Sequence, residues 1–110
     1  MIDRPFEHAD DLVAAARIPD RGILSQTISD ANGVRVVLFG FASGEELSEH
    51  TAARAAILEI VAGTAELVVG GERLDGRPGT WLRMRPRTPH SVRATTPLVL
   101  LLTLLPEGDG

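Results

Sequence analysis

Apolar and polar residues alternate in short runs along most of the chain, with turn-forming residues between the runs. Alternation with a period of two predicts a β-strand that buries one face. Strand signals occupy residues 23–29, 34–42, 46–52, 56–62, 65–69, 72–75, 80–85, 90–94 and 98–105. Asn32-Gly33 and Gly70-Gly71 supply the positive φ angles that tight hairpin turns need. About nine short strands joined by glycine and proline turns predict a sandwich or a barrel.

Two of these strands are apolar on both faces. The run 34–42 places Val34, Val36 and Leu38 on one face and Val37, Phe39 and Phe41 on the other. The run 98–105 is apolar almost throughout. Since only one face of a strand can fill the inside of a barrel, the other face needs a cover. We expect a second subunit to supply it, in a homodimer, with a short N-terminal helix as the competing cover.

The segment from Met1 to Ile18 holds the best candidate for a short helix. Asp10 or Asp11 can cap its start, and Pro19 ends it. With 110 residues, the chain is long enough for one domain and too short for two. The predicted organisation is an N-terminal helix and turn over residues 1–22, a β-barrel over residues 23–105 and a frayed tail over residues 106–110.

Composition excludes several classes of protein. The chain has no cysteine, so it can form neither a disulfide nor a thiolate metal site. Its net charge is −4, which disfavours a nucleic acid partner. The N-terminus is acidic and lacks the apolar centre of a signal peptide, and the run 98–105 is too short to cross a bilayer. We therefore expect a cytoplasmic protein that does not bind membranes.

Two histidines carry the candidate chemistry. His50 lies in the predicted strand 46–52 and His90 begins the predicted strand 90–94. The strands and hairpins between them could bring these two distant histidines together inside a small barrel. Two imidazoles alone make a weak metal site, since stable sites of transition metals use three or four ligands. A third ligand would come from Glu45, Glu46, Glu49, Glu59, Gln26 or His8, none of which stands at a diagnostic spacing. Glu59 is the most tempting, although strand alternation turns it away from the inside of a barrel.

The spacing of glycines around these histidines is similar to that of the two cupin motifs. The first motif has a glycine, a histidine after five residues, a second histidine, a glutamate and a closing glycine. Gly44, His50 and Gly63 fit it, while Ala52 replaces the second histidine and Ala56 the glutamate. In the second motif Gly79 and His90 fit, while Arg85, Arg87 and Ala94 replace its proline, its second glycine and its asparagine.

The resemblance is to a small single-domain cupin, and it implies an all-β fold. The expected architecture is a double-stranded β-helix, a jelly-roll barrel of two packed antiparallel sheets, with a short N-terminal helix. Cupins that keep all ligands bind a metal, and many of them are oxygenases or isomerases. Other cupins have lost the metal and only bind a small molecule. The chain keeps two of the usual four ligands, which puts metal chemistry in doubt.

Three hypotheses on function follow. The first is a barrel that binds a small molecule and needs no cofactor, where two alanines leave room and two neutral histidines orient a polar group. The expected pocket residues are His50, Ala52, Ala56, Leu58, Leu67, Met84, His90 and Val92. The second is a metal-dependent enzyme that holds Fe, Ni, Mn or Zn with His50, His90 and a nonstandard third ligand. The third is an interaction or structural protein whose barrel is only a scaffold.

Arginines and the single tryptophan form another group around residues 81–85. Trp81, Arg83 and Arg85 share one strand face, and Leu82 and Met84 share the opposite one. If Met84 points into the barrel, Trp81 and both arginines point outward. We expect a solvated or dimer-facing surface there, with an anion site as the alternative. Tryptophan on an outward face is typical of interaction surfaces.

Overall fold

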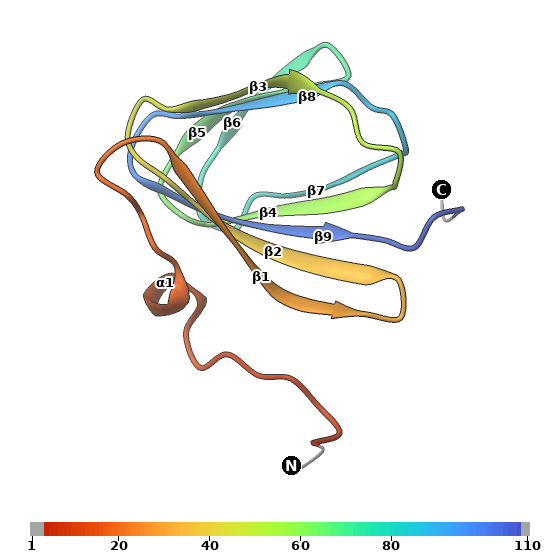
Figure 1. Cartoon of the computed structure of the whole chain (residues 1–110). Coiled ribbons are helices and arrows are strands. Elements are labelled where there is room, and N and C mark those ends of the chain that lie inside the picture. Colours follow the sequence, from red (N-terminus) through yellow and green to blue (C-terminus); the bar gives the residue numbers. More distant parts are fainter. Residues whose placement is uncertain (1–3, 109–110) are drawn as a thin grey trace.

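The computed structural model describes residues 4–108 and consists of two antiparallel β-sheets packed face to face (Figure 1). The strands are β1 (Ile23–Ala31), β2 (Val34–Phe41), β3 (Glu46–His50), β4 (Ala56–Ala62), β5 (Ala65–Val69), β6 (Glu72–Gly76), β7 (Trp81–Met84), β8 (His90–Ala94) and β9 (Leu98–Leu104). The five-stranded sheet has the order β1-β2-β9-β4-β7, and the four-stranded sheet has the order β3-β8-β5-β6. This is the predicted jelly-roll barrel.

The strands start and end within two residues of their predicted limits. β1 runs on to Ala31 because the turn at Asn32 and Gly33 is tight, with φ angles of 55° and 79°. β3 ends at His50 rather than at Ala52. Ala52 instead lies in the loop that leads to β4, where its carbonyl accepts a hydrogen bond from the backbone of the loop that follows β7.

The predicted short N-terminal helix forms as a single turn, α1 (Leu12–Ala15). Residues 1–3 of the segment predicted to hold it lie outside the described part of the chain. Asp11 caps this turn as predicted, since its carboxylate accepts the N–H groups of Val13 and Ala14 at 3.0 and 3.3 Å. A single turn without a long apolar face has little stability of its own, so its neighbours stay extended.

Residues 4–20, here called the N-terminal strap, run along the outer face of the five-stranded sheet (Figure 1). The strap comes closest at Gly40, where an added Cβ would lie 2.0 Å from the carbonyl oxygen of Arg17. On that outer face Leu38 is fully buried and Val99 is 1% exposed. The strap therefore covers the part of the sheet around β2 and β9, as expected of the competing cover.

The space between the two sheets is filled by apolar side chains. The buried cluster comprises Phe41, Ala56, Leu58, Ile60, Ala65, Leu67, Met84, Val92, Ala94, Leu98 and Leu100. These residues come from both sheets and from alternate positions of their strands, as the period of two predicts. The single core matches one domain. No helix among the described residues is long and apolar enough to cross a membrane.

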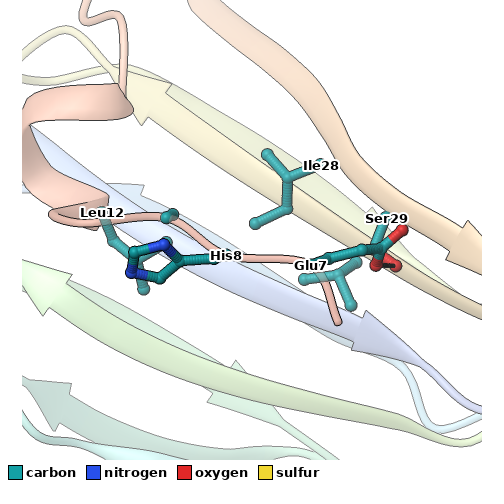
Figure 2. Close-up of a pocket in the computed structure, with 7 residues that line it drawn as sticks. Glu7, His8, Leu12, Ile28 and Ser29 are labelled. Carbon is teal, nitrogen blue, oxygen red and sulfur yellow. Dashed lines mark hydrogen bonds between the residues drawn. The ribbon is translucent and has the colours of Figure 1, made fainter. Parts of the chain in front are cut away.

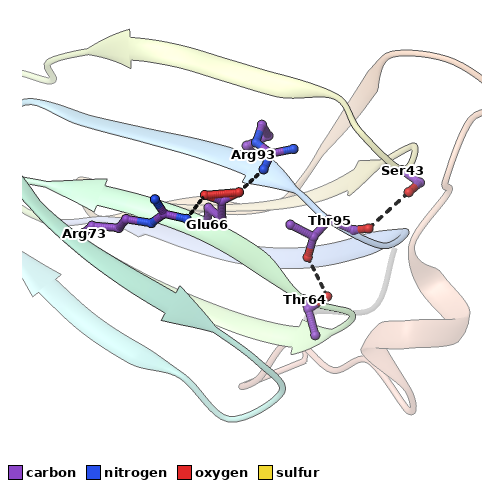
Figure 3. Close-up of polar contacts among 6 residues, drawn as sticks. All are labelled: Ser43, Thr64, Glu66, Arg73, Arg93 and Thr95. Atoms are coloured by element: carbon purple, nitrogen blue, oxygen red, sulfur yellow. Dashed lines mark hydrogen bonds and ion pairs between the residues drawn. The ribbon is translucent and has the colours of Figure 1, made fainter.

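The outer face of the four-stranded sheet is charged. Glu66 on β5 accepts ion pairs from Arg73 on β6 and Arg93 on β8 (Figure 3). At the end of the barrel away from the histidines, the hydroxyls of Thr64 and Thr95 lie 2.7 Å apart and join two loops. This sheet thus turns a solvated surface outward, unlike the five-stranded sheet under its strap.

Candidate functional site

The two histidines stand side by side at one end of the barrel. His50 is the last residue of β3, His90 is the first residue of β8, and the antiparallel register pairs them directly. Their ring centroids are 4.1 Å apart and the ring planes are inclined by 59°. Residues that face each other across two antiparallel strands point to the same side of the sheet. This geometry confirms the sequence prediction that His50 and His90, although distant in the chain, could come together in the barrel.

Each imidazole is held by the backbone just upstream of it. The Nδ1–H of His50 donates to the carbonyl of Ser48 at 2.8 Å, and the Nδ1–H of His90 donates to the carbonyl of Thr88 at 2.8 Å. Because a carbonyl can only accept, Nδ1 carries the proton in both neutral rings. The Nε2 atoms are then left as two acceptors, and neither has a hydrogen-bond partner among residues 4–108.

The two rings differ in their exposure to water. His90 is 7% exposed, whereas His50 is exposed at the rim of the barrel. Burial lowers the pKa of His90 below its ordinary value of 6.5 and is the largest effect. The hydrogen bond to Thr88 opposes this lowering, and the neighbouring His50 adds a smaller lowering. His90 is therefore held neutral at the inner side of the site, and its Nε2 stays an acceptor at neutral pH.

The other expected pocket residues divide into rim and core. Ala52 is half-buried in the loop after β3, close to His50 in the chain. The remaining members, Ala56, Leu58, Leu67, Met84 and Val92, belong to the buried core cluster. Ala56 begins β4 and Met84 ends β7, at the same end of the barrel as the histidines (Figure 1). The candidate site is therefore the end of the barrel at His50, His90 and Ala52, with the buried Ala56, Met84 and the other core side chains packed beneath it.

The side chains at this site do not supply the three or four ligands that hold a resident transition metal ion. Carbonyl-anchored imidazoles with free Nε2 atoms suit a metal. Among residues 4–108, however, no group of three or more His, Cys, Asp or Glu side chains could hold one. Glu59 lies on the outer face opposite Trp81, as predicted, and the carboxylate of Glu45 accepts the N–H of Gly22 at 2.8 Å.

Two loop arginines, Arg54 and Arg87, make contacts near this end of the barrel that were not predicted from the sequence. Arg87 adopts a left-handed conformation with φ of 61°, and its N–H donates to the carbonyl of Ala52 at 2.7 Å. The guanidinium of Arg54 donates to the carbonyls of Leu105, at 2.8 Å, and Gly33. These contacts join the loops that carry Ala52, the β7–β8 connection and the chain after β9. Only the proline and glycine spacing around Arg87 hinted at an unusual turn.

A separate hollow of about 360 Å³ lies under the N-terminal strap, outside the barrel. Figure 2 shows Glu7, His8 and Leu12 of the strap on one side and Ile28 and Ser29 of β1 on the other. Glu7 accepts a hydrogen bond from the hydroxyl of Ser29, and His8 pairs with Asp10 at 3.2 Å. No pattern in the sequence predicted this hollow, because it depends on where the strap lies.

The two-sheet barrel with histidines paired across β3 and β8 invites a comparison with known proteins. A family model described as a cupin domain matches residues 37–104, which is more than half of the chain and includes both histidines. The chain belongs to the cupin family. The resemblance seen in the glycine and histidine spacing is thereby confirmed. No curated protein sequence matches this cupin.

Solved structures with a similar fold can be aligned with most of this cupin. A conserved protein of unknown function from Streptococcus pyogenes is 24% identical over 96% of this chain and 95% of its own, with a TM-score of 0.82. A cupin superfamily protein from Desulfitobacterium hafniense is 22% identical over 94% of both chains, with a TM-score of 0.84. Salicylate 1,2-dioxygenase from Pseudoaminobacter salicylatoxidans is 17% identical over 76% of this chain and 25% of its own, with a TM-score of 0.70. Identities this low show the shared fold alone.

Proposed function

We propose that this cupin binds a small molecule at the histidine end of its barrel. The observation that carries the proposal is the pair of Nε2 acceptors of His50 and His90, fixed by backbone carbonyls and free of partners among the described residues. Apolar side chains, including those of Ala56 and Met84, lie at the same end. An apolar surface with a few fixed polar atoms is the usual composition of a small-molecule site.

The two acceptors define the chemistry of the ligand. A group placed between them must donate hydrogen bonds, so the polar end is a hydroxyl or an ammonium group rather than a carboxylate. Ala52 and Ala56 stand in the motif spacing where cupins with a complete metal site carry a histidine and a glutamate, and we infer that these smaller side chains make room for a ligand. The ligand therefore has a short apolar arm and a donor at its end.

Nuclear magnetic resonance of the side-chain nitrogens of His50 and His90 tests this proposal. The probes are small primary alcohols with one apolar arm, each compared with its methyl ether, which keeps the shape and loses the donor. We expect the alcohols to shift both Nε2 resonances and the ethers to leave them in place. His50→Ala and His90→Ala should abolish the response, while His8→Ala, a control in the strap, should retain it. Equal responses to alcohol and ether would contradict the proposal.

The competing function is a metal-dependent enzyme. The observation that favours it is the pair of imidazoles anchored by backbone carbonyls. On our proposal the purified, untagged protein holds far less than one transition metal ion per chain, because Ala52 and Ala56 supply no ligand. Elemental analysis measures this directly. About one Fe, Ni, Mn or Zn ion per chain, lost in His50→Ala, would replace the binding proposal with the enzyme.

The proposed setting is a homodimer in the cytoplasm. The homodimer is proposed because the strap covers only part of the outer face of the five-stranded sheet. It covers Leu38 and leaves Trp81 58% exposed. The ligand site lies within one chain, so binding at the histidines does not depend on the second copy.

A further inference from the structure

Exposed apolar side chains of this cupin gather on one side of the molecule. Among residues 4–108, the large apolar side chains that remain exposed are Phe6, Val13, Ile18, Leu24, Ile28 and Trp81. The first three belong to the strap, the next two to β1 and the last to β7. Scattered exposed apolar residues are ordinary in a monomer, but a group on one face is typical of an interaction surface.

The strand register places Trp81 on the same face as the strap. Trp81 pairs with Glu59, Glu59 pairs with Leu101, and Leu101 pairs with Leu38. Paired residues share a face of the sheet, and Leu38 and Gly40 also share one because they are two positions apart. The strap crosses at Gly40. Trp81 therefore projects from the outer face of the five-stranded sheet, beside the region that the strap covers.

The same register accounts for the exposed residues of β1. Leu24 pairs with Gly40, so it projects to the strap side of the sheet. Ile28 lines the hollow between the strap and β1 (Figure 2). The opposite side of the molecule, by contrast, carries the ion pairs of Glu66 with Arg73 and Arg93 (Figure 3). The apolar exposure is thus confined to the strap side.

Charges of opposite sign flank this apolar surface. Residues 76–106 contain no acidic side chain, and Arg77, Arg83, Arg85 and Arg87 lie on and around β7, which is an edge strand. None of these four arginines has an ion-pair partner within the described residues. The strap, residues 4–20, carries four acidic residues and two arginines. One edge of the surface is therefore basic and the strap is acidic.

We propose that this surface is a two-fold interface between copies of the chain, in which the β7 edge of one copy lies against the acidic strap of the other. A second copy is the fitting occupant because the chain presents both charges of the complementary pair. Two-fold symmetry then makes the strap-to-β7 contact twice. Trp81 lies at the apolar part of each contact and is buried by association. This rests on the proposed homodimer and is independent of the proposed ligand site.

The single tryptophan of the chain reports on this interface directly. Because Trp81 is 58% exposed in one chain, its fluorescence should move to shorter wavelength as rising protein concentration forms the dimer. Light scattering on the same samples should show a mass of two chains. Trp81→Asp should raise the dissociation constant of the dimer at least about tenfold, or about 1.4 kcal/mol. Glu72→Arg, an exposed change on the four-stranded sheet, should leave it unchanged.

Charge reversal tests which surfaces meet. One variant combines Arg77→Glu, Arg83→Glu and Arg85→Glu, so that its β7 edge and its strap are both acidic. A second combines Asp10→Arg with Asp20→Arg, so that both surfaces are basic. Each variant alone should be a monomer, because like charges face each other. An equimolar mixture should form a dimer of one chain of each kind, because both contacts again join opposite charges.

Three results would overturn the proposal. The first is a monomer with an unshifted Trp81 spectrum at the highest soluble concentration. The second is a dimer that Glu72→Arg weakens while Trp81→Asp does not, which would place the interface on the other sheet. The third is a mixture of the two charge variants that stays monomeric although each variant keeps the melting temperature of a folded chain. Failure of the alcohol probes at His50 and His90 would leave all three measurements unaffected.

Discussion

At the scale of single residues, the site depends on how the backbone orients two imidazoles. His50 and His90 each donate their Nδ1–H to a carbonyl two residues earlier, so a local contact sets the tautomer of both rings. The burial of His90 then removes its charge at neutral pH. A neutral, fixed acceptor beside a second exposed acceptor is what a donor ligand requires.

The lowered pKa of His90 predicts how stability depends on pH. The unfolded chain binds a proton on His90 near pH 6.5, whereas the folded chain binds it only at lower pH. The free energy of unfolding should therefore fall as pH decreases below 6.5 toward the lowered pKa of the folded state, because protonation favours the unfolded chain. Denaturant melts across this range should show a smaller loss for His90→Gln than for the parent.

The control for this pH dependence is His8→Gln. His8 is exposed in the strap and pairs only with Asp10 among the described residues, so its replacement should leave the slope nearly unchanged. Carboxylates also titrate at low pH, and the comparison between variants removes their common contribution. A slope for His90→Gln equal to that of the parent would show that His90 binds its proton equally well in both states.

At the scale of elements, the strands and the start of the short helix were predictable, but the length of the helix was not. Each strand is encoded locally by alternation and by the turn residues at its ends, such as Asn32-Gly33. The pairing of His50 with His90 followed from the motif spacing that identifies the fold. The extent of α1 could not be predicted in this way, because a capping signal at Asp11 fixes where a helix starts and says little about how far tertiary contacts let it continue.

The path of the strap could not be predicted from the sequence, although it explains why residue 40 is a glycine. Gly40 lies within β2, where glycine weakens a strand, yet its φ is not positive. Glycine is needed here because the backbone of Arg17 and Ile18 passes close by, and an added Cβ would meet it at 2.0 and 3.1 Å. Contacts of this kind join segments far apart in the chain. The hydrogen bonds of Arg54 and Arg87 near the site escaped prediction for the same reason.

Gly40→Ala should therefore detach the strap. The new Cβ meets a backbone carbonyl that cannot move alone, so we expect a loss of about 1–3 kcal/mol in the free energy of unfolding. Trypsin should also cleave faster after Arg17. Gly76→Ala is the matched control, because its Cβ would meet the flexible end of Ile60 at 2.3 Å. It should destabilise the core without faster cleavage at Arg17, and equal cleavage in both variants would contradict this account of Gly40.

At the scale of the whole molecule, the site exists because the two sheets close on each other. His50 and His90 belong to the four-stranded sheet, whereas Ala56 begins β4 in the five-stranded sheet. The hydrogen bond from Arg87 to Ala52 holds the connecting loops at this end. In the motif spacing, Ala52 and Ala56 occupy the positions of a histidine and a glutamate. If the barrel places these positions as in cupins with a complete ligand set, the missing ligands can be restored.

Ala52→His with Ala56→Glu should accordingly create a metal site from both sheets. Three imidazoles and a carboxylate suit Fe, Ni or Zn, and we expect calorimetry to show at least about tenfold tighter binding of Zn²⁺ or Ni²⁺ than in the parent, or about 1.4 kcal/mol. Without metal, the melting temperature should fall, because a carboxylate enters the position of Ala56, which is 2% exposed; added metal should restore it.

The control is Ala52→His with Ile57→Glu, which has the same new groups but turns the carboxylate to the outer face, so its metal affinity should rise little. A folded double variant with no gain in affinity would mean that Ala52 and Ala56 do not face His50 and His90, and the proposed ligand site would then lose its walls.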